Sequence, residues 1–528
     1  MENDGLVERS QRADRAGRLL EVERHPGFPG QMRFVRFSAC ALLTLASLTV
    51  GALSQERRAS SSAGSERTVA ILNGDYPDPS IVRDGDDFYL TNSAYDYVPG
   101  MLIWHSKDLR HWTPIARALS HQTGDIWAPD FIHYKGLFYI YFPAKGTNWV
   151  ITARSPYGPW SEPIDLKVRG IDPGHVATPE GKRYLYVDSG KVIELAPDGL
   201  STVGTLQKVY DGWAYPEEWA VECFCSESPK LIYRGGYYYL LTAEGGTSGP
   251  TTSHMAVLAR SRNPMGPWEN SPLNPLIHTS SAKEPWWSTG HATLIDNGRG
   301  QWFAVYHAYE NGHRNLGRQI LLSPVEWTAD GWLKPLDPMA KGTAPVIVPN
   351  HQIHSEDLSK TELSLEWQFS GIASKDDYRI NDGIISFEAE PDKLKVLHTQ
   401  AANHNYEASV KLDVTPGAEA GLILFYGSKA YAGIGMSEGR IFNIRMARNS
   451  RGTAECADCR FLKLRLIDDD LSTYYSADGI VWKKTESSID VSVYQTNALG
   501  NFSSIKLGIY GKGSGLVKIE QFTYHPLP

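Results

Sequence analysis

Cysteine, clustered basic charge and helical periodicity are all scarce in this chain. The formal net charge is -8 in 528 residues, and no Lys/Arg run of the nucleic-acid-binding kind follows the N-terminal region. This charge pattern favours a neutral partner over a polyanion, so we expect no nucleic-acid binding. Apolar residues rarely recur at helical intervals, which predicts an all-β protein. A content of 41% hydrophobic and 11% aromatic residues is ordinary for a soluble β-rich protein and argues against disorder.

The few cysteines fall into two pairs once the N-terminal Cys40 is set aside. Cys223 and Cys225 form a C-x-C pair, and Cys456 and Cys459 form a C-x-x-C pair. Such spacings occur in zinc sites, but the two pairs lie over 230 positions apart and in different expected domains, which argues against a shared zinc ion. A local disulfide between Cys456 and Cys459 is the expected arrangement in an oxidising compartment.

The N-terminal region reads as a targeting segment and not as part of the fold. Arg33 and Arg36 precede an apolar stretch over residues 37–52, which is shorter than the ~20 residues that a membrane-spanning helix needs. We therefore expect export to the periplasm or the extracellular space without stable membrane insertion; a retained membrane anchor is the alternative. The expected segments are an upstream start-site artefact at residues 1–31, a signal peptide at 32–54 and a flexible lead-in at 55–68.

One pattern recurs five times between residues 80 and 310. A turn rich in Gly and Asp leads into a short run of aromatic and aliphatic residues, and a single polar residue stands about six to nine positions before each turn. The turns follow one another at intervals of roughly 45 to 64 residues, which is typical of an array of small sheets. The polar residues ahead of the five turns are Asp78, Asp130, Asp172, Glu227 and His291.

Five such units predict a five-bladed β-propeller over residues 69–346. The innermost strands of a propeller face one central channel, so residues at equivalent strand starts meet at one mouth of it. We therefore expect four carboxylates and a histidine to converge. Residues 340–350 carry Gly and Pro without periodicity and read as a linker. Alternating strands separated by Gly, Asp and Asn turns follow, and they predict a concanavalin-like β-sandwich over residues 350–528.

Five motifs in this order resemble glycoside hydrolase family 43, the five-bladed propellers that cleave arabinose- and xylose-containing glycans. The resemblance spans about residues 69–346, and the downstream sandwich is similar, more weakly, to the C-terminal domain of the family's β-xylosidases. The motifs are GDYPDPSIVRDGDDFYL, DIWAPDFIHYKGLFYIYF, GIDPGHVATPEGKRYLYV, ESPKLIYRGGYYYLLTAEGGT and GRQILLSPVEW.

Glycoside hydrolysis needs one carboxylic acid to protonate the leaving oxygen and one carboxylate to activate water or attack carbon. The resemblance implies that Asp78 is the general base and Glu227 the general acid. It implies that Asp172 is a third carboxylate, which raises the pKa of Glu227 and orients it. Each of the three stands within two positions of a proline, so a role in shaping a turn is the structural alternative. Glu222, five residues before Glu227, is the competing acid.

Five further residues are candidates for substrate binding: Tyr95, Trp127, Asp130, His291 and Arg318. Tyr95 lies in a segment similar to the one that closes the terminal-sugar pocket of the family's β-xylosidases, which favours exo-action. Asp130 is equally well interpreted as a turn cap, His291 as a core histidine and Arg318 as part of a structural salt bridge. The resemblance gives His291 a possible contact to Ca²⁺ through water, although Ca²⁺ prefers oxygen ligands. No cofactor is required.

The sequence thus predicts an exported, inverting exo-glycosidase that releases terminal β-D-xylose or α-L-arabinofuranose from plant-type oligosaccharides or polysaccharides. A β-D-galactofuranosidase and an endo-arabinanase of the same fold are alternatives. A sugar-binding propeller without catalysis is an alternative of another class, and it would lack one of the three carboxylates. The sandwich is expected to be a structural partner of the propeller, with a carbohydrate-binding module as the alternative.

Overall fold

The structure, a computed structural model, describes residues 67–188, 190–336, 346–348, 362–485 and 488–528. The expected start-site artefact at residues 1–31, the expected signal peptide at 32–54, most of the lead-in and most of the linker lie outside these residues. Within the described ranges, no helix combines the length and apolar character needed to cross a membrane.

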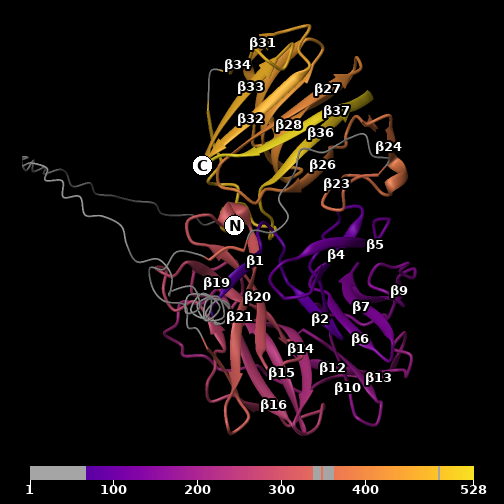
Figure 1. The fold of residues 1–528 in the computed structure, drawn as a ribbon, viewed down its shortest axis with the longest axis vertical. Coiled ribbons are helices and arrows are strands. Elements are labelled where there is room, and N and C mark those ends of the chain that lie inside the picture. Colours follow the sequence, from indigo (N-terminus) through magenta and orange to yellow (C-terminus); the bar gives the residue numbers. More distant parts are fainter. Residues whose placement is uncertain (1–66, 189, 337–345, 349–361, 486–487) are drawn as a thin grey trace, which may run out of the picture. The chain divides into compact units, whose positions relative to one another are not determined.

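The first three blades are antiparallel sheets of four strands each, built in chain order from the channel outward (Figure 1). Blade 1 contains β2 (Ser80–Asp84), β3 (Asp87–Thr91), β4 (Gly100–Ser106) and β5 (Thr113–Leu119); blade 2 contains β6 (Asp130–Tyr134), β7 (Leu137–Ala144), β8 (Thr147–Ala153) and β9 (Ile164–Asp165); blade 3 contains β10 (Gly174–Ala177), β11 (Arg183–Val187), β12 (Lys191–Leu195) and β13 (Thr202–Lys208).

The fourth and fifth blades complete the ring, and the fifth takes its outer strand from the start of the domain. In that sheet β1 pairs with β21, so the two ends of the propeller sequence close the ring together. Blade 4 contains β14 (Ser226–Arg234), β15 (Tyr237–Glu244), β16 (Met255–Ser261), β17 (Glu269–Asn270) and β18 (Ile277–His278); blade 5 contains β19 (Trp286–Asp296), β20 (Trp302–Glu310), β21 (Arg318–Trp327), β22 (Leu333–Pro335) and β1 (Val69–Leu72).

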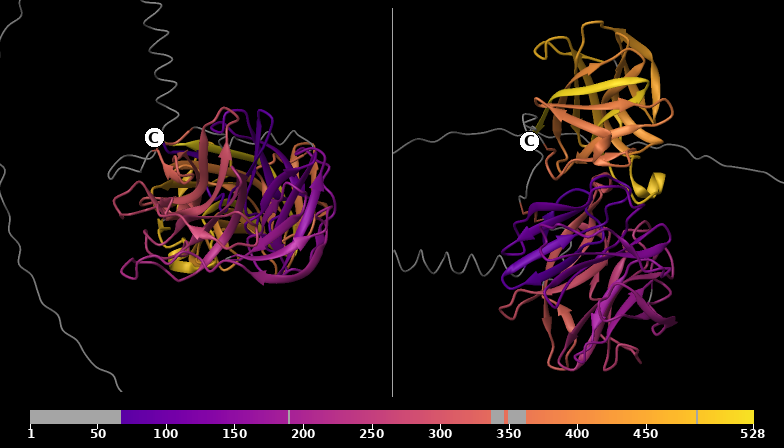
Figure 2. Two further views of the ribbon diagram at one scale, coloured as in Figure 1. Left: turned by 90° about the horizontal axis from the view of Figure 1, so that it is seen from below. Right: turned by 90° about the vertical axis from the view of Figure 1, so that its right-hand side faces the viewer.

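The predicted turns connect the first two strands of each blade. The Lys135–Gly136 and Gly235–Gly236 turns are two-residue loops with positive φ at both positions, the geometry that matches the twist of a tight hairpin. The inner strands also contact one another in order: β2 with β6, β6 with β10, β10 with β14, β14 with β19, and β19 with β2. This closed cycle, drawn in Figures 1 and 2, confirms the predicted five-bladed propeller.

The C-terminal region folds into two facing sheets, as predicted for a sandwich. Alternate residues of β27 are buried, so one face of its sheet packs into the core. One sheet has the order β23 (Gln368–Ser370), β26 (Lys395–Gln400), β36 (Lys506–Gly513), β28 (Ala418–Gly427), β29 (Ala430–Ser437), β30 (Arg440–Arg445) and β31 (Arg448–Glu455); the other has the order β24 (Tyr378–Asn381), β25 (Ile384–Ala389), β37 (Gly515–Pro526), β27 (Tyr406–Val414), β32 (Phe461–Ile467), β33 (Asp470–Ser476) and β34 (Lys483–Lys484), with β35 (Ile489–Asp490) beside β33.

Helices are short in the described chain, which agrees with the predicted all-β class. They are the 3-10 helices η1 (Arg314–Leu316) and η2 (Lys375–Asp377) and the helix α2 (Thr496–Leu499). The predicted disulfide between Cys456 and Cys459 is confirmed. A second disulfide joins Cys223 to Cys225, which the sequence interpretation missed. Because all four thiols are used in disulfides, they are not available as zinc ligands.

Direct contacts join the sandwich to the propeller. Val98 of blade 1 exchanges two backbone hydrogen bonds with Phe369 of the sandwich, at 2.9 and 2.7 Å, and lies within the apolar core of the sandwich. Asp75 of the propeller forms a buried ion pair with Lys506, at 3.5 Å between Oδ2 and Nζ. These contacts bury both apolar and charged groups, so they favour the structural-partner interpretation of the sandwich over a tethered module.

Candidate active site

Unusual backbone conformations occur where the inner strands carry their predicted polar residues. Asp78, Asp172 and His291 have φ values of 60°, 54° and 56°, in the left-handed region that non-glycine residues rarely adopt. Glu227 precedes Ser228, which has a φ of 55° and lies in an irregularity of the β14–β15 pairing. The repetition on the inner strands of four blades fits a site whose side chains are held in place by local strain.

The structure brings Asp78, Asp172, Glu227 and His291 together, although they come from four different blades. His291 Nδ1 lies 3.4 Å from Asp78 Oδ1 and 3.7 Å from Glu227 Oε1. The Asp172 side chain accepts a hydrogen bond from the Ser228 amide at 3.1 Å, and its charge acts directly on Glu227. The imidazole of His291 therefore lies between two carboxyl groups, with the third close to Glu227.

Asp78 is held from several directions. Its Oδ1 accepts a hydrogen bond from Arg318 Nη1 at 3.1 Å, and its Oδ2 accepts one from the Ser93 hydroxyl at 2.6 Å. Burial alone would raise the pKa of Asp78, but the Arg318 guanidinium and the His291 imidazole outweigh it and hold that pKa well below its ordinary value. Asp78 is therefore ionised at any pH near neutrality.

Arg318 links Asp78 to the rim of the site. Its Nη2 donates to the Tyr95 hydroxyl at 2.9 Å, and that hydroxyl donates to the backbone carbonyl of Phe502 at 2.7 Å. Phe502 belongs to the sandwich, so the second domain contributes to the site directly. Arg318 is predicted to bind substrate hydroxyls; in the free site it forms the structural ion pair named as the alternative, and its substrate contact stays a prediction.

Asp172 and Glu227 form a coupled pair of carboxyl groups. Burial, followed by the negative charge of Glu227, raises the pKa of Asp172 from 3.8 to about 7. Burial pushes the pKa of Glu227 upward too, but the nearby His291 imidazole outweighs it and leaves that pKa lowered. Asp172 and Glu227 titrate as one unit, and the role of Glu227 as the general acid stays a prediction. The pair still retains one proton near neutral pH.

Two further channel histidines were missed by sequence reasoning. The rings of His254 and His307 stack at 5.2 Å, and His307 stacks on His291 at 5.5 Å. His307 Nδ1 accepts the Asp78 backbone amide at 3.1 Å, so this ring is neutral with its proton on Nε2, facing the Thr247 hydroxyl. Burial lowers the pKa of His254 to about 3 and that of His307 to about 4, which agrees with neutral rings.

A glycine signals this histidine packing in the sequence. Gly290 precedes His291, and a Cβ atom at Gly290 would lie 2.1 Å from His254 Cδ2, too close for any side chain there. Gly174 shows the same requirement between blades 3 and 4, because a Cβ would meet the Pro229 carbonyl oxygen at 1.5 Å. Both glycines stand two residues or fewer from a predicted site residue, so close packing at the channel explains them.

Asp130 is placed in a structural ion pair rather than at an open surface. Its Oδ1 contacts Lys230 Nζ at 3.1 Å, and its Oδ2 accepts the His175 amide at 2.7 Å. Lys230 Nζ also donates to the carbonyls of Pro129 and Pro173, which ties blades 2, 3 and 4 together. Both oxygens of Asp130 are engaged in contacts between blades and not in the turn cap expected as the alternative, and a contact with sugar stays a prediction.

The remaining sequence candidates differ in accessibility. Trp127 is 42% exposed and precedes Ala128, whose amide donates to the same Ser93 hydroxyl that binds Asp78. A solvent-exposed indole so near Asp78 is suited to stacking on a sugar. Glu222, the competing acid, is exposed and accepts the Ser248 amide at 2.9 Å. It is not among the groups that surround His291.

The channel clusters offer nitrogen-rich donor sets to a metal. Asp78, His291 and His307 form one set, and Glu227, His254 and His291 form another, with the ligand atoms of each set within 4.8 Å of one another. Two imidazoles and a single carboxylate do not fit the oxygen coordination that Ca²⁺ prefers. Direct Ca²⁺ ligation is therefore a poor fit to these residues, and a water-mediated Ca²⁺ contact of His291 stays a prediction.

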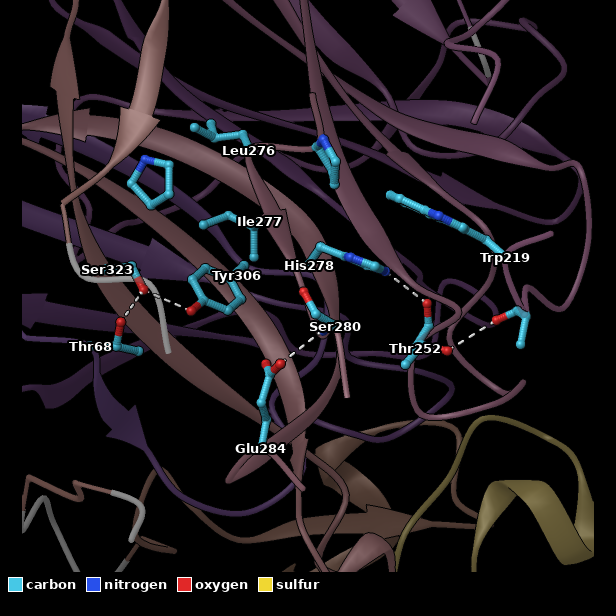
Figure 3. Close-up of a pocket in the computed structure, with 13 residues that line it drawn as sticks. Thr68, Trp219, Thr252, Leu276, Ile277, His278, Ser280, Glu284, Tyr306 and Ser323 are labelled. Atoms are coloured by element: carbon cyan, nitrogen blue, oxygen red, sulfur yellow. Dashed lines mark hydrogen bonds between the residues drawn. The ribbon is translucent and has the colours of Figure 1, made fainter. Parts of the chain in front are cut away.

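A cavity of about 510 Å³ lies away from the candidate catalytic residues (Figure 3). Its lining comes from blades 4 and 5 and includes Trp219, whose indole stacks on His278 at 4.7 Å. Hydroxyls of Thr68 and Tyr306 hydrogen-bond to the Ser323 hydroxyl on the opposite side. None of its lining residues is a candidate catalytic residue.

Comparison with known families gives two matches that together cover most of the chain. The family described as "Glycosyl hydrolases family 43" matches residues 68–333. The family described as "Beta xylosidase C-terminal Concanavalin A-like domain" matches residues 355–524. The two matches lie on the propeller and the sandwich respectively.

Curated relatives and a solved structure are similar to this chain over most of its length. The chain is 30% identical over 499 residues to a non-reducing end alpha-L-arabinofuranosidase of Bacteroides ovatus, covering 84% of this chain and 91% of the relative. It is 30% identical to a xylosidase/arabinosidase of Butyrivibrio fibrisolvens, covering 84% of this chain and 95% of the relative. The crystal structure of the GH43 protein BlXynB from Bacillus licheniformis superposes with a TM-score of 0.75 at 26% identity, covering 87% of this chain and all of that one.

Proposed function

The chain belongs to glycoside hydrolase family 43, and from this premise we propose that it is an inverting exo-glycosidase releasing terminal β-D-xylose or α-L-arabinofuranose. The names of its relatives, a non-reducing end arabinofuranosidase and a xylosidase/arabinosidase, support these two sugars. The substrate class is a plant-type oligosaccharide or polysaccharide. Export is part of the proposal and is supported by the signal-peptide pattern at residues 32–54.

The observation that best supports this proposal is that two carboxyl groups beside one imidazole differ in charge and in exposure. Asp78 is kept ionised by Arg318, as a base that activates water must be. The Glu227 side chain is 30% exposed, compared with 9% for Asp78, so it is the carboxyl that can reach the leaving-group oxygen. Both groups lie within 3.7 Å of the same His291 nitrogen, so an acid and a base face one site, as the proposed reaction requires.

In the reaction we propose, Glu227 gives its proton to the glycosidic oxygen while the bond from this oxygen to the anomeric carbon breaks. Asp78 takes a proton from water, whose oxygen attacks the anomeric carbon from the opposite face. The acid proton comes from the Asp172–Glu227 pair, which titrates as a unit. Asp172 thus acts as a reservoir and positioning group beside the acid.

Exo-action is supported by how one side of the site is closed. The Tyr95 hydroxyl, the Arg318 guanidinium and the Phe502 carbonyl are hydrogen-bonded into one wall made from both domains. A wall of this kind favours a pocket that accepts one terminal sugar over a cleft open at both ends. We assign Trp127 to stacking on the sugar, since its indole is exposed and its neighbour Ile126 exchanges backbone hydrogen bonds with Tyr95.

A panel of substrates tests the proposal. We expect turnover of 4-nitrophenyl β-D-xylopyranoside or α-L-arabinofuranoside, and monosaccharide as the first product from xylo- or arabino-oligosaccharides. The Asp78→Asn variant serves as the inactive control. Early release of di- and trisaccharides would instead indicate an endo-acting enzyme. Binding of oligosaccharides without turnover of any substrate would support the sugar-binding propeller.

A further inference from the structure

Two histidines and a glutamate from different domains meet outside the candidate active site. Glu310 ends β20 of blade 5, and His313 lies three residues further, immediately before η1. His404 comes from the sandwich, in the loop between β26 and β27. None of the three contacts a residue assigned to catalysis above. The cluster therefore calls for an explanation of its own.

The geometry of the cluster is close. Glu310 Oε2 lies 3.1 Å from His404 Nε2, and the His313 and His404 rings stack at 3.7 Å with 10° between their planes. One ligand atom from each of the three residues can be chosen so that all lie within 4.8 Å of one another. Tetrahedral zinc with bonds of roughly 2.0–2.1 Å needs ligand atoms a little over 3 Å apart, which the Glu310–His404 contact already meets.

The side chains have the chemistry and the access that a borderline cation requires. Two imidazoles and one carboxylate are the donors of many open zinc sites, which leave a position for water. Glu310 is held by a second hydrogen bond, from Gln319 Nε2 to Oε2 at 3.2 Å, of the kind that orients metal-binding carboxylates. The His404 side chain is 34% exposed, so an ion can enter from solvent.

The surroundings carry negative charge, and one imidazole has no hydrogen-bond partner among the described residues. Asp468 and Asp469 lie close enough to act electrostatically on His313. Asp469 is fixed by a hydrogen bond from Asn315 at 2.6 Å, and the Asp468 amide donates to Asn405, the neighbour of His404. Among the described residues, no group hydrogen-bonds to the His313 ring, which leaves its nitrogen lone pair available beside Glu310.

We propose that Glu310, His313 and His404 bind a Zn²⁺-type divalent cation that joins the propeller to the sandwich. The stacked rings present parallel faces, so coordination of one ion requires a rotation of the His313 ring, which no hydrogen bond opposes. The ion replaces the direct contact between His404 and Glu310. It would clamp the segment between β20 and β21 to the loop before β27.

Zinc titration of the full-length protein tests this site. After EDTA treatment and desalting, calorimetry with ZnCl₂ should show one Zn²⁺ per chain. His404→Ala and Glu310→Gln should each weaken binding by at least about ten-fold, since even outer-shell changes cost 10- to 100-fold. His111→Ala is the matched control, because His111 is an exposed imidazole paired with an aspartate in blade 1 and should bind as the unaltered protein does.

Thermal unfolding provides the second readout. ZnCl₂ should raise the Tm of the unaltered protein and of His111→Ala, but not that of His404→Ala or Glu310→Gln. Activity in EDTA should be the same in His404→Ala as in the unaltered protein, which shows that the variant is folded. The proposal is overturned if no Zn²⁺ binds. It is equally overturned if both cluster variants bind Zn²⁺ with unaltered affinity, which would place the ion at the channel histidines.

Discussion

At the scale of single residues, the surroundings of each carboxyl group decide its charge. Asp78 has a guanidinium and an imidazole beside it, whereas Asp172 has burial and another carboxylate. The same residue type is therefore an anion in one place and a proton carrier in the other. This difference allows one site to supply both a base and an acid at the same pH.

Replacement of Glu227 tests its part as the acid. Glu227→Ala should lower kcat on xylo- or arabino-oligosaccharides by roughly 10²- to 10⁴-fold, the usual worth of general acid catalysis. The loss should be much smaller on a 4-nitrophenyl glycoside, because a good leaving group needs little protonation. Steady-state kinetics on both substrates gives the comparison. Equal losses on the two substrates would contradict the assignment of Glu227 as the acid. Glu222→Ala is the control, and its rates on the two substrates should keep the ratio that the unaltered protein shows.

Asp172→Asn should change the pH profile in a defined direction. Removal of a negative neighbour makes ionisation of Glu227 easier, so the alkaline limb of kcat/KM should move to lower pH. Measurement of rates from pH 4 to pH 9 checks this, in about half-unit steps. If the alkaline limb of kcat/KM does not move, Asp172 only positions Glu227 and does not tune its pKa.

The same substitution should also alter stability with pH. The pKa of Asp172 rises from 3.8 to about 7 on folding, so ionisation opposes folding above about pH 7 and not below about pH 4. Asp172→Asn should therefore have the higher Tm at pH 8 and should lose this advantage as the pH falls toward 4. An advantage that is constant with pH would show that packing, not charge, causes it.

Residue-level prediction from sequence succeeds where a local pattern marks the position. Asp78, Asp172, Glu227 and His291 all stand at the same place ahead of a blade turn, and the structure brings them together. Their charge states were less predictable, because these depend on partners such as Arg318 that are remote in sequence. The Lys230 contact of Asp130 is equally remote and carries no local signal.

At the scale of elements, the inner strands hold the site by close packing and strained backbone. The prediction of five blades rests on turns and alternation, which are local properties of the chain. The packing of β16 against β19 is not local, and it places His254 over Gly290. Sequence reasoning therefore found the strands of the channel but missed two of its three stacked histidines.

Gly290→Ala tests how tightly these strands pack. The new Cβ would lie 2.1 Å from His254 Cδ2, so the ring must shift, at an expected cost of about 1–3 kcal/mol in the free energy of unfolding. Because His254 neighbours the catalytic groups, kcat should fall as well. Gly427→Ala is the control, since no atom lies within 4 Å of its added Cβ. Urea titration and steady-state kinetics of both variants give the comparison. Equal stability and equal kcat in the two variants would contradict this account.

At the scale of the whole molecule, the two domains share a buried charge pair and one wall of the site. Neither feature can be predicted from the sequence pattern of one domain, because its two partners lie in different domains. The family resemblance predicts that a propeller and a sandwich occur together in this chain, but not which residues join them. The identity of the contacts, Asp75 with Lys506 and Tyr95 with Phe502, required the structure.

Lys506→Met tests whether this pairing stabilises the protein. It would leave Asp75 buried without its cation, and breaking such a pair typically costs about 3–5 kcal/mol. Lys512→Met is the control, because Lys512 is partly exposed and its pair with Glu419 is worth about 1 kcal/mol or less. Chemical unfolding should separate the two variants clearly. Equal stability would mean that the Asp75 charge is neutralised in another way.

The most direct test of the central claim is the configuration of the first sugar released. Proton NMR of a fresh reaction with a β-D-xyloside distinguishes the two anomers of xylose before they interconvert. If Asp78 activates water opposite the Glu227 acid, α-D-xylose appears first and the β-anomer follows only by mutarotation. If β-D-xylose appears first, the reaction retains configuration, and the assignment of Asp78 as a base acting through water is wrong.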